Sequence, residues 1–230
     1  MYSKEIKNDI LNWDVETWSE ILPFWENQLE KLDKSNSICI EIGARDGGIS
    51  LWMALKGFQI TCSDNYYDLS EAKKLNKKYK VEQKVFYKKV DLLNWNEQEK
   101  YDVIVMKSVL GALQTEERIE KAIENIYHNL NENGILLFAE NAKGSYFHRK
   151  LRRRFTDWGA IWFYFDERSL RKAFNPFQKV KYQFNGISGV FANRLKLSRI
   201  FSRFDKIVLN KIVPNQMKYM VYGYAKKITA

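Results

Sequence analysis

Apolar positions change their spacing several times along the chain, and each change predicts a new structural element. Between residues 15 and 32 the apolar side chains recur every three or four residues, which is typical of one helix face, and Asp14 stands where an N-cap is expected. From residue 38 onward short continuous apolar runs replace this spacing, and such runs predict buried strands. The runs cover residues 38–42, 59–63, 84–90, 102–106 and 135–139.

Helical segments are expected between these runs. They cover residues 47–55, 68–79 and 115–130, and two C-terminal segments, 180–184 and 219–225, predict a final strand pair after a helix at 168–174. Strands that alternate with helices form a parallel sheet covered on both faces, and right-handed crossovers make that sheet doubly wound. We therefore expect an α/β fold with a mostly parallel, doubly wound, seven-stranded sheet, whose ligands lie beyond the carboxyl ends of the strands.

Composition narrows the class of protein. The chain has 230 residues, of which 45% are apolar and 29% charged, and this favours one globular domain. Cys39 and Cys62 are the only cysteines and there are two histidines, so neither a disulfide scaffold nor a metal site is expected. The sequence contains no apolar run long enough to span a membrane and no apolar leader, which makes a cytoplasmic protein the expectation.

Charge is distributed unevenly along the chain. Residues 1–110 carry 16 basic and 18 acidic side chains, a net charge of −2, whereas residues 111–230 carry 22 and 10, a net charge of +12. A local positive field attracts phosphates, carboxylates, nucleic acid or an anionic membrane surface. The second half is therefore expected to meet an anionic partner, with an ordinary solvated basic surface as the alternative.

A glycine-containing loop follows the first apolar run. It contains Gly43 and Gly47 and comes directly after Glu41 and Ile42. Glycines allow a tight turn and the close approach of a ligand. Dinucleotide-binding loops have a glycine where this chain has Arg45, because a side chain there would exclude the pyrophosphate, so Arg45 argues against NAD or FAD.

Acidic residues end the next two predicted strands. Asp64 lies 21 residues after Gly43, and a carboxylate at that point can accept hydrogen bonds from both hydroxyls of a ribose. Asp91 follows the third run in the same way. Each acid alone is also compatible with an ordinary turn at a strand end.

The glycine loop, Asp64 and Asp91 together resemble the class I S-adenosylmethionine (SAM)-dependent methyltransferases over residues 36–142. The resemblance implies SAM as the cofactor, with the loop glycines at its methionine end, Asp64 at the ribose and Asp91 at the adenine. The residues it implies at the cofactor are Glu41, Gly43, Arg45, Gly47, Asp64, Asn65, Asp91, Leu92 and Lys107. Arg45 departs from the glycine that is commoner in the family.

The same resemblance divides the single domain, residues 1–230, into three parts. Residues 1–35 are expected to form a helical cap over the cofactor cleft, with simple docking on the sheet as the alternative. Residues 36–142 form the SAM-binding core, and residues 143–230 form an acceptor-binding part with a helical insertion at 187–215.

The segment after the fifth predicted strand carries the candidates for acceptor chemistry. His148 titrates near neutrality and is the candidate base for a hydroxyl proton, with Glu140 and Asn141 beside it, and a surface position for His148 is the alternative. Residues 107–111 lack the Asn/Asp-Pro-Pro-Tyr pattern of nucleobase amino methyltransferases, and no cysteine follows the fourth or fifth strand. The acceptor atom is therefore expected to be an oxygen or a simple amine nitrogen.

Basic and aromatic side chains follow the candidate base. Guanidinium groups clamp phosphates and carboxylates, and aromatic rings stack on sugars. The expected acceptor-binding residues are Tyr146, Arg149, Arg152, Arg153 and Trp162. This segment, with Trp13 and Trp18, is similar to small methyltransferases of bacterial capsule and lipopolysaccharide clusters, which implies O-methylation of a sugar or of a phosphorylated or acidic sugar derivative. An RNA or tRNA methyltransferase and a non-catalytic SAM-binding protein are the alternatives.

Apolar and cationic side chains interleave between residues 190 and 213. This pattern predicts an amphipathic helix. We favour a lid over the substrate or a contact with a partner, such as a second copy in a homodimer. Peripheral contact with an anionic membrane is the alternative.

Overall fold

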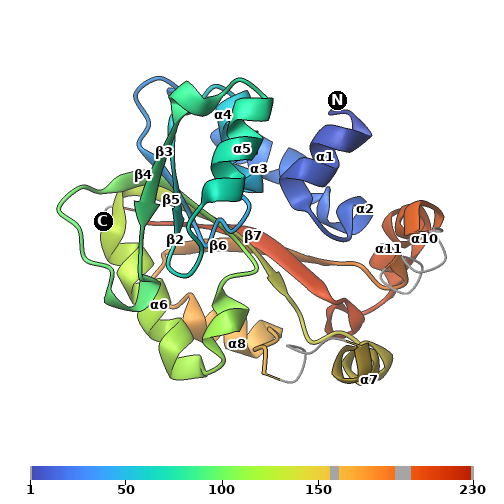
Figure 1. Ribbon diagram of the computed structural model, residues 1–230. Helices are drawn as coiled ribbons and strands as arrows, with labels where there is room; N and C mark the ends of the chain where they lie inside the picture. Colours follow the sequence, from blue (N-terminus) through green and yellow to red (C-terminus); the bar gives the residue numbers. More distant parts are fainter. Residues whose placement is uncertain (1, 156–160, 190–197, 229–230) are drawn as a thin grey trace.

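A seven-stranded sheet forms the centre of the molecule (Figure 1). The structure is a computed structural model, and it describes residues 2–155, 161–189 and 198–228. The strands are β1 (Cys39–Ile42), β2 (Ile60–Asp64), β3 (Val85–Lys89), β4 (Tyr101–Lys107), β5 (Leu130–Asn141), β6 (Lys179–Asn185) and β7 (Met220–Lys226). Their spatial order is β3-β2-β1-β4-β5-β7-β6. The first five strands are parallel, and β7 runs antiparallel to β5 and β6. The predicted fold class is confirmed.

Helices cover both faces of the sheet. Cys39 and Val103 pack into a core with the N-terminal helices, whereas Ile40 and Ile104, one residue further along the same strands, pack into the opposite core. This alternation explains the continuous apolar runs, because a strand buried on both faces needs apolar residues at every position. The helices are α1 (Lys4–Leu11), α2 (Val15–Trp18), α3 (Ile21–Leu29), α4 (Gly48–Leu55), α5 (Ser70–Lys78), α6 (Glu116–Asn129), α7 (Tyr146–Phe155), α8 (Glu167–Ala173), α10 (Ser198–Phe204) and α11 (Asn210–Ile212).

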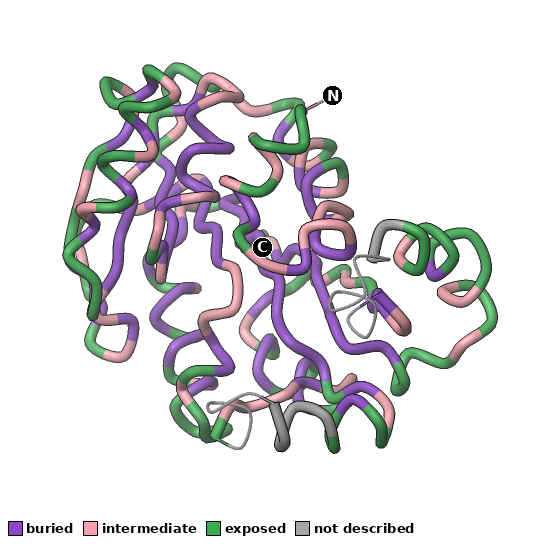
Figure 2. The backbone as a smooth tube through the Cα atoms, turned by 45° about the vertical axis from the view of Figure 1, so that its right-hand side comes forward, coloured by how far each residue is buried: buried purple, intermediate pink, exposed green. Residues whose placement is uncertain are grey.

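Shorter turns connect these elements. They are the 3₁₀ segments Glu82–Lys84, Leu92–Asn94, Leu110–Leu113 and Asn215–Met217, and a π-helical turn, Asp205–Leu209, that joins α10 to α11. The tube in Figure 2 shows that the sheet strands are the most deeply buried part of the chain and that the α10–α11 segment is largely exposed. Because β6 and β7 belong to the same sheet as β1 to β5, the C-terminal part shares its core with the rest of the domain.

The N-terminal prediction requires a correction. The expected helix from residue 15 to 32 is divided into α2 and α3, and α1 precedes them without a clear sequence signal. Asp14 stands at the N-cap of α2, as expected, but its side chain makes no capping hydrogen bond; its backbone is left-handed at φ 44°, and its carboxylate accepts a hydrogen bond from the distant Tyr219 hydroxyl. Trp18 and Trp25 are nevertheless fully buried, as the spacing predicts. The spacing of apolar residues predicts which side chains are buried. It does not predict whether the backbone hydrogen bonds of a helix continue without a break.

Candidate functional site

The loop between β1 and α4 requires glycine at two positions. Gly43 and Gly47 have φ values of 67° and 77°, in the left-handed region that favours glycine. A Cβ atom on Gly43 would lie 2.6 Å from Cγ2 of Val109, and one on Gly47 would lie 2.5 Å from Cβ of Ala72. Backbone conformation and close packing therefore both fix these glycines.

Asp64 ties this loop to the end of β2. Its Oδ2 accepts a hydrogen bond from the Arg45 amide at 2.9 Å, and its Oδ1 accepts from the amides of Tyr66 and Tyr67 at 2.8 and 3.1 Å. The Asp64 side chain is buried at the carboxyl edge of the sheet, where parallel β1 and β2 end together. The loop glycines and the predicted ribose ligand thus belong to one hydrogen-bonded unit.

Asp91 occupies the corresponding place after β3. Its Oδ1 accepts from the Leu93 amide at 3.1 Å and its Oδ2 from Asn94 Nδ2 at 2.7 Å, so it caps the short turn that follows. Leu92 beside it is buried, and Asn65, after Asp64, is partly exposed. The structure therefore brings together the predicted residues of all three strand ends.

Glu41 lies inside the protein beneath the loop. Its Oε2 accepts hydrogen bonds from the amide and the hydroxyl of Ser50, at 2.7 and 2.5 Å. Burial raises the pKa of the Glu41 carboxyl to about 7, although the bonds from Ser50 act in the opposite direction. Its contact is with the first turn of α4, so any effect on a ligand passes through the loop.

Lys107, at the end of β4, lies against the N-terminal segment. Its Nζ donates to the Leu11 carbonyl at 3.1 Å and lies 5.3 and 5.1 Å from the ring centroids of Trp13 and Trp18. Burial lowers the pKa of Lys107 to about 8, while the carboxylates of Glu41 and Glu140 act to raise it. Two indole rings and a carbonyl oxygen thus surround a single ammonium group.

The N-terminal segment also covers the glycine loop. Asn12 Nδ2 donates to Asp46 Oδ2 at 2.7 Å, and a Cβ atom on Gly48 would lie 2.2 Å from the Ile10 carbonyl oxygen. The end of α1 therefore packs against the glycine loop and the first turn of α4, and its predicted role as a cap over the cofactor stays a prediction.

Glu140 and Asn141 end β5 in the interior. Oε1 of Glu140 accepts from the amides of Val109 and Leu110 at 2.8 and 2.7 Å, and among the described residues its buried Oε2 has no hydrogen-bond partner. Burial raises the pKa of Glu140 to about 7. Asn141 is buried as well, with Nδ2 3.5 Å from Ser108 Oγ. Both side chains contact the loop after β4, and their predicted part in acceptor chemistry stays a prediction.

His148 is neither a surface residue nor open to the cleft. Its Nδ1 accepts from the Ser145 amide at 3.1 Å, and its Nε2 lies 2.7 Å from the Ile187 carbonyl oxygen, to which it donates. An Nδ1 that accepts from an amide must carry the lone pair, so the proton is on Nε2. The ring is 3% exposed and packs against the ring of Tyr219. Acting as a base would require one of these bonds to open.

Three of the five predicted acceptor-binding side chains are described by the structure, and they lie in different surroundings. Tyr146 and Arg149 are exposed on α7, whereas Trp162 is half-buried. A Cβ atom on Gly111 would lie 1.8 Å from Trp162 Nε1, so this ring packs on the loop after β4. The side chains of Arg152 and Arg153 lie outside the described residues.

Sequence analysis missed a buried polar network beside β7. The Tyr219 hydroxyl donates to Asp14 Oδ2 at 2.5 Å and lies 2.8 Å from Thr17 Oγ1, which is 3.1 Å from Ser202 Oγ. Burial and the Asp14 carboxylate raise the pKa of Tyr219 well above its usual range. The network joins segments more than 180 residues apart, and no spacing in the sequence indicates such a contact.

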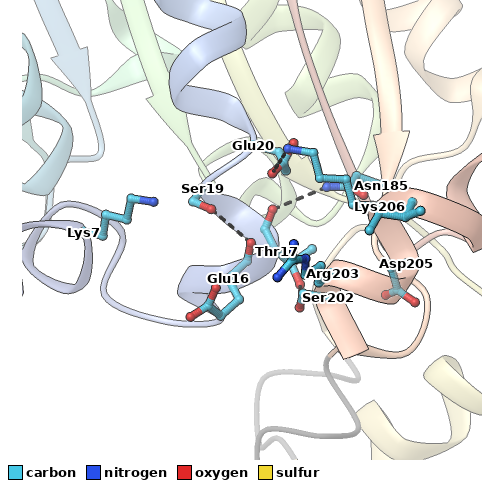
Figure 3. Close-up of a pocket in the computed structure, with 11 residues that line it drawn as sticks. Lys7, Glu16, Thr17, Ser19, Glu20, Asn185, Ser202, Arg203, Asp205 and Lys206 are labelled. Atoms are coloured by element: carbon cyan, nitrogen blue, oxygen red, sulfur yellow. Dashed lines mark hydrogen bonds and ion pairs between the residues drawn. The ribbon is translucent and has the colours of Figure 1, made fainter. Parts of the chain in front are cut away.

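A pocket of about 490 Å³ lies beside this network, between the N-terminal helices and the α10–α11 segment (Figure 3). Ten of the eleven residues that line it are polar or charged, with charges of both signs, and the Lys206–Glu20 ion pair of 3.0 Å lies among them. The lining residues are Lys7, Glu16, Thr17, Ser19, Glu20, Asn185, Ser202, Arg203, Asp205, Lys206 and Ile207. None of the residues predicted to bind cofactor or acceptor is among them.

Residues 17–178 match the protein family described as "Methyltransferase domain", and the chain therefore belongs to the methyltransferase-domain family. No curated protein shows significant sequence similarity to it. The predicted methyltransferase domain and its SAM cofactor are confirmed at the level of this family. No comparison supports the finer similarity to capsule and lipopolysaccharide enzymes, which stays a prediction.

Solved structures of methyltransferases share the fold. Phosphoethanolamine N-methyltransferase 2 of Haemonchus contortus, solved with SAM, has 14% sequence identity and a TM-score of 0.65; the match covers 92% of this chain and 53% of that one. This chain thus spans about half the length of that enzyme. The N-methyltransferase NodS of Bradyrhizobium japonicum WM9, solved with S-adenosylhomocysteine, has 15% identity and a TM-score of 0.61, with 97% of each chain covered. A putative sarcosine dimethylglycine methyltransferase of Galdieria sulphuraria has 14% identity and a TM-score of 0.63, with 99% of this chain and 92% of that one covered.

The described residues contain neither a metal-binding cluster nor a membrane-spanning helix. No group of three or more His, Cys, Asp or Glu side chains in these ranges is arranged to hold a metal ion. No helix within them is long and apolar enough to cross a membrane.

Proposed function

We propose that this protein transfers the methyl group of SAM to a small acceptor bound beside the carboxyl edge of the sheet. The observation that carries the proposal is the hydrogen bond from the Arg45 amide to Asp64, because it holds the glycine loop and the strand-end carboxylate in one unit. Strand ends in this fold class are where ligands bind.

The residues of this edge fit SAM. Gly43 and Gly47 allow the tight loop against which the methionine end would lie, and the Asp64 carboxylate lies beside that loop, where it would accept from a ribose. Asp91 supplies the acceptor oxygen for an adenine amino group. When bound, SAM supplies an electrophilic methyl carbon on a sulfonium, and the chain's contribution is to hold the acceptor in line with it.

For the acceptor we propose a sugar hydroxyl on a phosphorylated or acidic sugar derivative, of the kind used for bacterial surface polysaccharides in the cytoplasm. Residues 143–230 carry 20 basic and 4 acidic side chains, and this excess favours an anionic acceptor. Arg149 and Lys150 are exposed on α7, shortly after the end of β5. The choice of a sugar rests on the resemblance of this segment to capsule-cluster enzymes that the sequence suggests.

RNA is the second candidate acceptor, because the same basic excess would attract a phosphate backbone. Binding that weakens steeply with salt and is independent of sugar ligands would favour it.

Calorimetry with SAM followed by methyl transfer from labelled SAM tests the proposal. The acceptor panel contains nucleotide sugars, phosphosugars, simple phosphorylated amines and tRNA, and mass spectrometry identifies the product. We expect SAM binding and a methylated sugar derivative. Absence of SAM binding by the folded protein would overturn the enzyme assignment, and a methylated amine or RNA would overturn the sugar assignment alone.

A further inference from the structure

The segment from α10 to α11 has one face turned toward the protein. Ser202 contacts Thr17, and the carboxylate of Asp205 accepts hydrogen bonds from the amides of Ile187, Ser188 and Gly189 at 2.9, 2.8 and 3.0 Å. Asp205 is 2% exposed. These bonds fix the segment rigidly against the end of β6.

The other face is apolar and exposed. Ile200, Phe204 and Ile207 follow one another at spacings of four and three residues, which places them on one side of the helical segment. Ile200 is 66% exposed, Phe204 50%, Ile207 55% and Ile212 71%. Such side chains gathered on one face, rather than scattered singly, indicate an interaction surface. Figure 1 shows α10 and α11 at the edge of the molecule, with α7 at the same end.

The charges that this segment itself exposes are cationic, and one of them, Lys206, is paired with Glu20 of the N-terminal segment at 3.0 Å. Arg203, Lys206 and Lys211 are exposed between the apolar positions. Asp205 is the only acidic residue between 198 and 217, and its carboxylate is used inside the protein. The exposed surface of the segment is therefore apolar at its centre and cationic around it.

We propose that the α10–α11 surface, defined by Ile200, Phe201, Phe204, Ile207, Val208 and Ile212 with the cations among them, docks the protein on an anionic lipid membrane. An apolar helix face bordered by Lys and Arg inserts at the boundary between headgroups and acyl chains, while the cations contact anionic headgroups.

The chemistry of this face favours a lipid membrane over two other partners, a second copy of the chain and RNA. A second copy of the chain docked through the same face would bring like charges together, which is unfavourable. RNA offers phosphates for the cations and bases for the phenylalanines, but it offers no partner for Ile200, Ile207 and Ile212. The acyl chains of a lipid membrane accommodate all of these apolar side chains. The proposal does not depend on the acceptor or on methyl transfer.

Sedimentation of the full-length protein with vesicles tests the proposal. We expect it to pellet with phosphatidylcholine vesicles that contain about 30% phosphatidylglycerol, and to stay in the supernatant with phosphatidylcholine alone. The variant Ile200→Ser/Phe204→Ser/Ile207→Ser should lower binding about tenfold or more. Arg203→Glu should lower it about fivefold or more, and more strongly at low salt.

Phe86→Ser is the matched control, because Phe86 is 56% exposed but lies on β3 at the other edge of the sheet. It should bind vesicles like the wild type, and circular dichroism should show that all variants are folded. Failure of the wild type to bind anionic vesicles overturns the proposal. If vesicle binding is absent, the protein is then tested for a dimer in light scattering and for RNA binding. When the triple variant abolishes either interaction, the surface is reassigned to that partner.

Discussion

The polar side chains at the two ends of the carboxyl edge differ in how far along the chain their partners lie. At the predicted cofactor end, Asp64 binds amides two, three and 19 residues away, and Asp91 binds an amide two residues away. At the predicted acceptor end, Tyr219 binds Asp14, 205 residues away, and His148 binds the nearby Ser145 amide and the carbonyl of Ile187, 39 residues away. The first set closes short turns and ties the glycine loop to the end of β2, whereas the second also connects segments from opposite ends of the chain.

This difference predicts different consequences of mutation. A side chain that closes a local turn can be removed without separating distant elements, so its loss should fall mainly on ligand binding. A buried side chain that joins distant segments leaves unpaired groups on both when it is removed, so its loss should fall on stability and on the order of those segments. Four experiments test the comparison.

Asp64→Ala should have the largest effect, on the cofactor. Two hydrogen bonds from ribose hydroxyls to a carboxylate would be lost, and we expect SAM affinity to fall about 100-fold or more in calorimetry. The amides of Arg45, Tyr66 and Tyr67 would also lose their shared acceptor, so the free energy of unfolding should fall as well, and urea denaturation measures that loss separately. Asp68→Ala is the control, because that exposed carboxylate lies four residues further on and bonds only the Ser70 amide. Equal SAM affinity in the Asp64 variant and the wild type would contradict the ribose assignment.

Gly43→Ala should destabilise the fold by about 2–4 kcal/mol in urea denaturation, because it combines a left-handed backbone with overlap against Val109. Gly57→Ala separates the two causes. Gly57 has φ 103°, but a Cβ atom there would lie 3.6 Å from the nearest atom, in Lys34. We expect Gly57→Ala to lower the free energy of unfolding by about 1 kcal/mol. Equal costs at both glycines would show that the contact with Val109 is not tight.

Asp205→Ala should destabilise the fold by about 1–3 kcal/mol, because three amides lose their shared acceptor. Hydrogen exchange should become faster at residues 187–189 and 198–212, while residues 43–48 keep wild-type protection. Asp33→Ala is the control, since Asp33 is exposed and bonds only Ser35 and Asn36, and it should change stability by less than about 0.5 kcal/mol. Faster exchange spread evenly over the chain would contradict the separation of the two ends.

Glu140→Gln should have the smallest effect, on the pH dependence of stability. The folded pKa of Glu140 is raised to about 7, so between about pH 4.5 and 7 the folded protein binds more protons than the unfolded chain. The free energy of unfolding contributed by this group therefore decreases as pH rises through that window and is constant above it. The glutamine amide does not titrate. Between pH 5 and 7.5, the free energy of unfolding measured in urea should therefore fall by about 1–2 kcal/mol less in the variant than in the wild type. Glu124→Gln, on the exposed face of α6, should keep the wild-type slope.

The strands, their alternation with helices and the glycine loop after β1 could be predicted from the sequence because they depend on local properties. Buried parallel strands need continuous apolar runs, and the loop after β1 needs Gly43 and Gly47 at left-handed positions. The division between α2 and α3 could not be predicted, because both helices bury the same apolar stripe that one helix would bury.

His148, Glu140 and Tyr219 show what only the tertiary structure decided. From the sequence His148 was expected at an open cleft or on the surface, whereas folding buries it between Ser145 and the Ile187 carbonyl. The role of a polar group follows from its partners and its distance from water. Those partners come from segments that the fold, rather than the neighbouring sequence, brings into contact. Local patterns therefore determined the sheet and the glycine loop, and long-range packing decided which polar groups of the acceptor end remain available for chemistry.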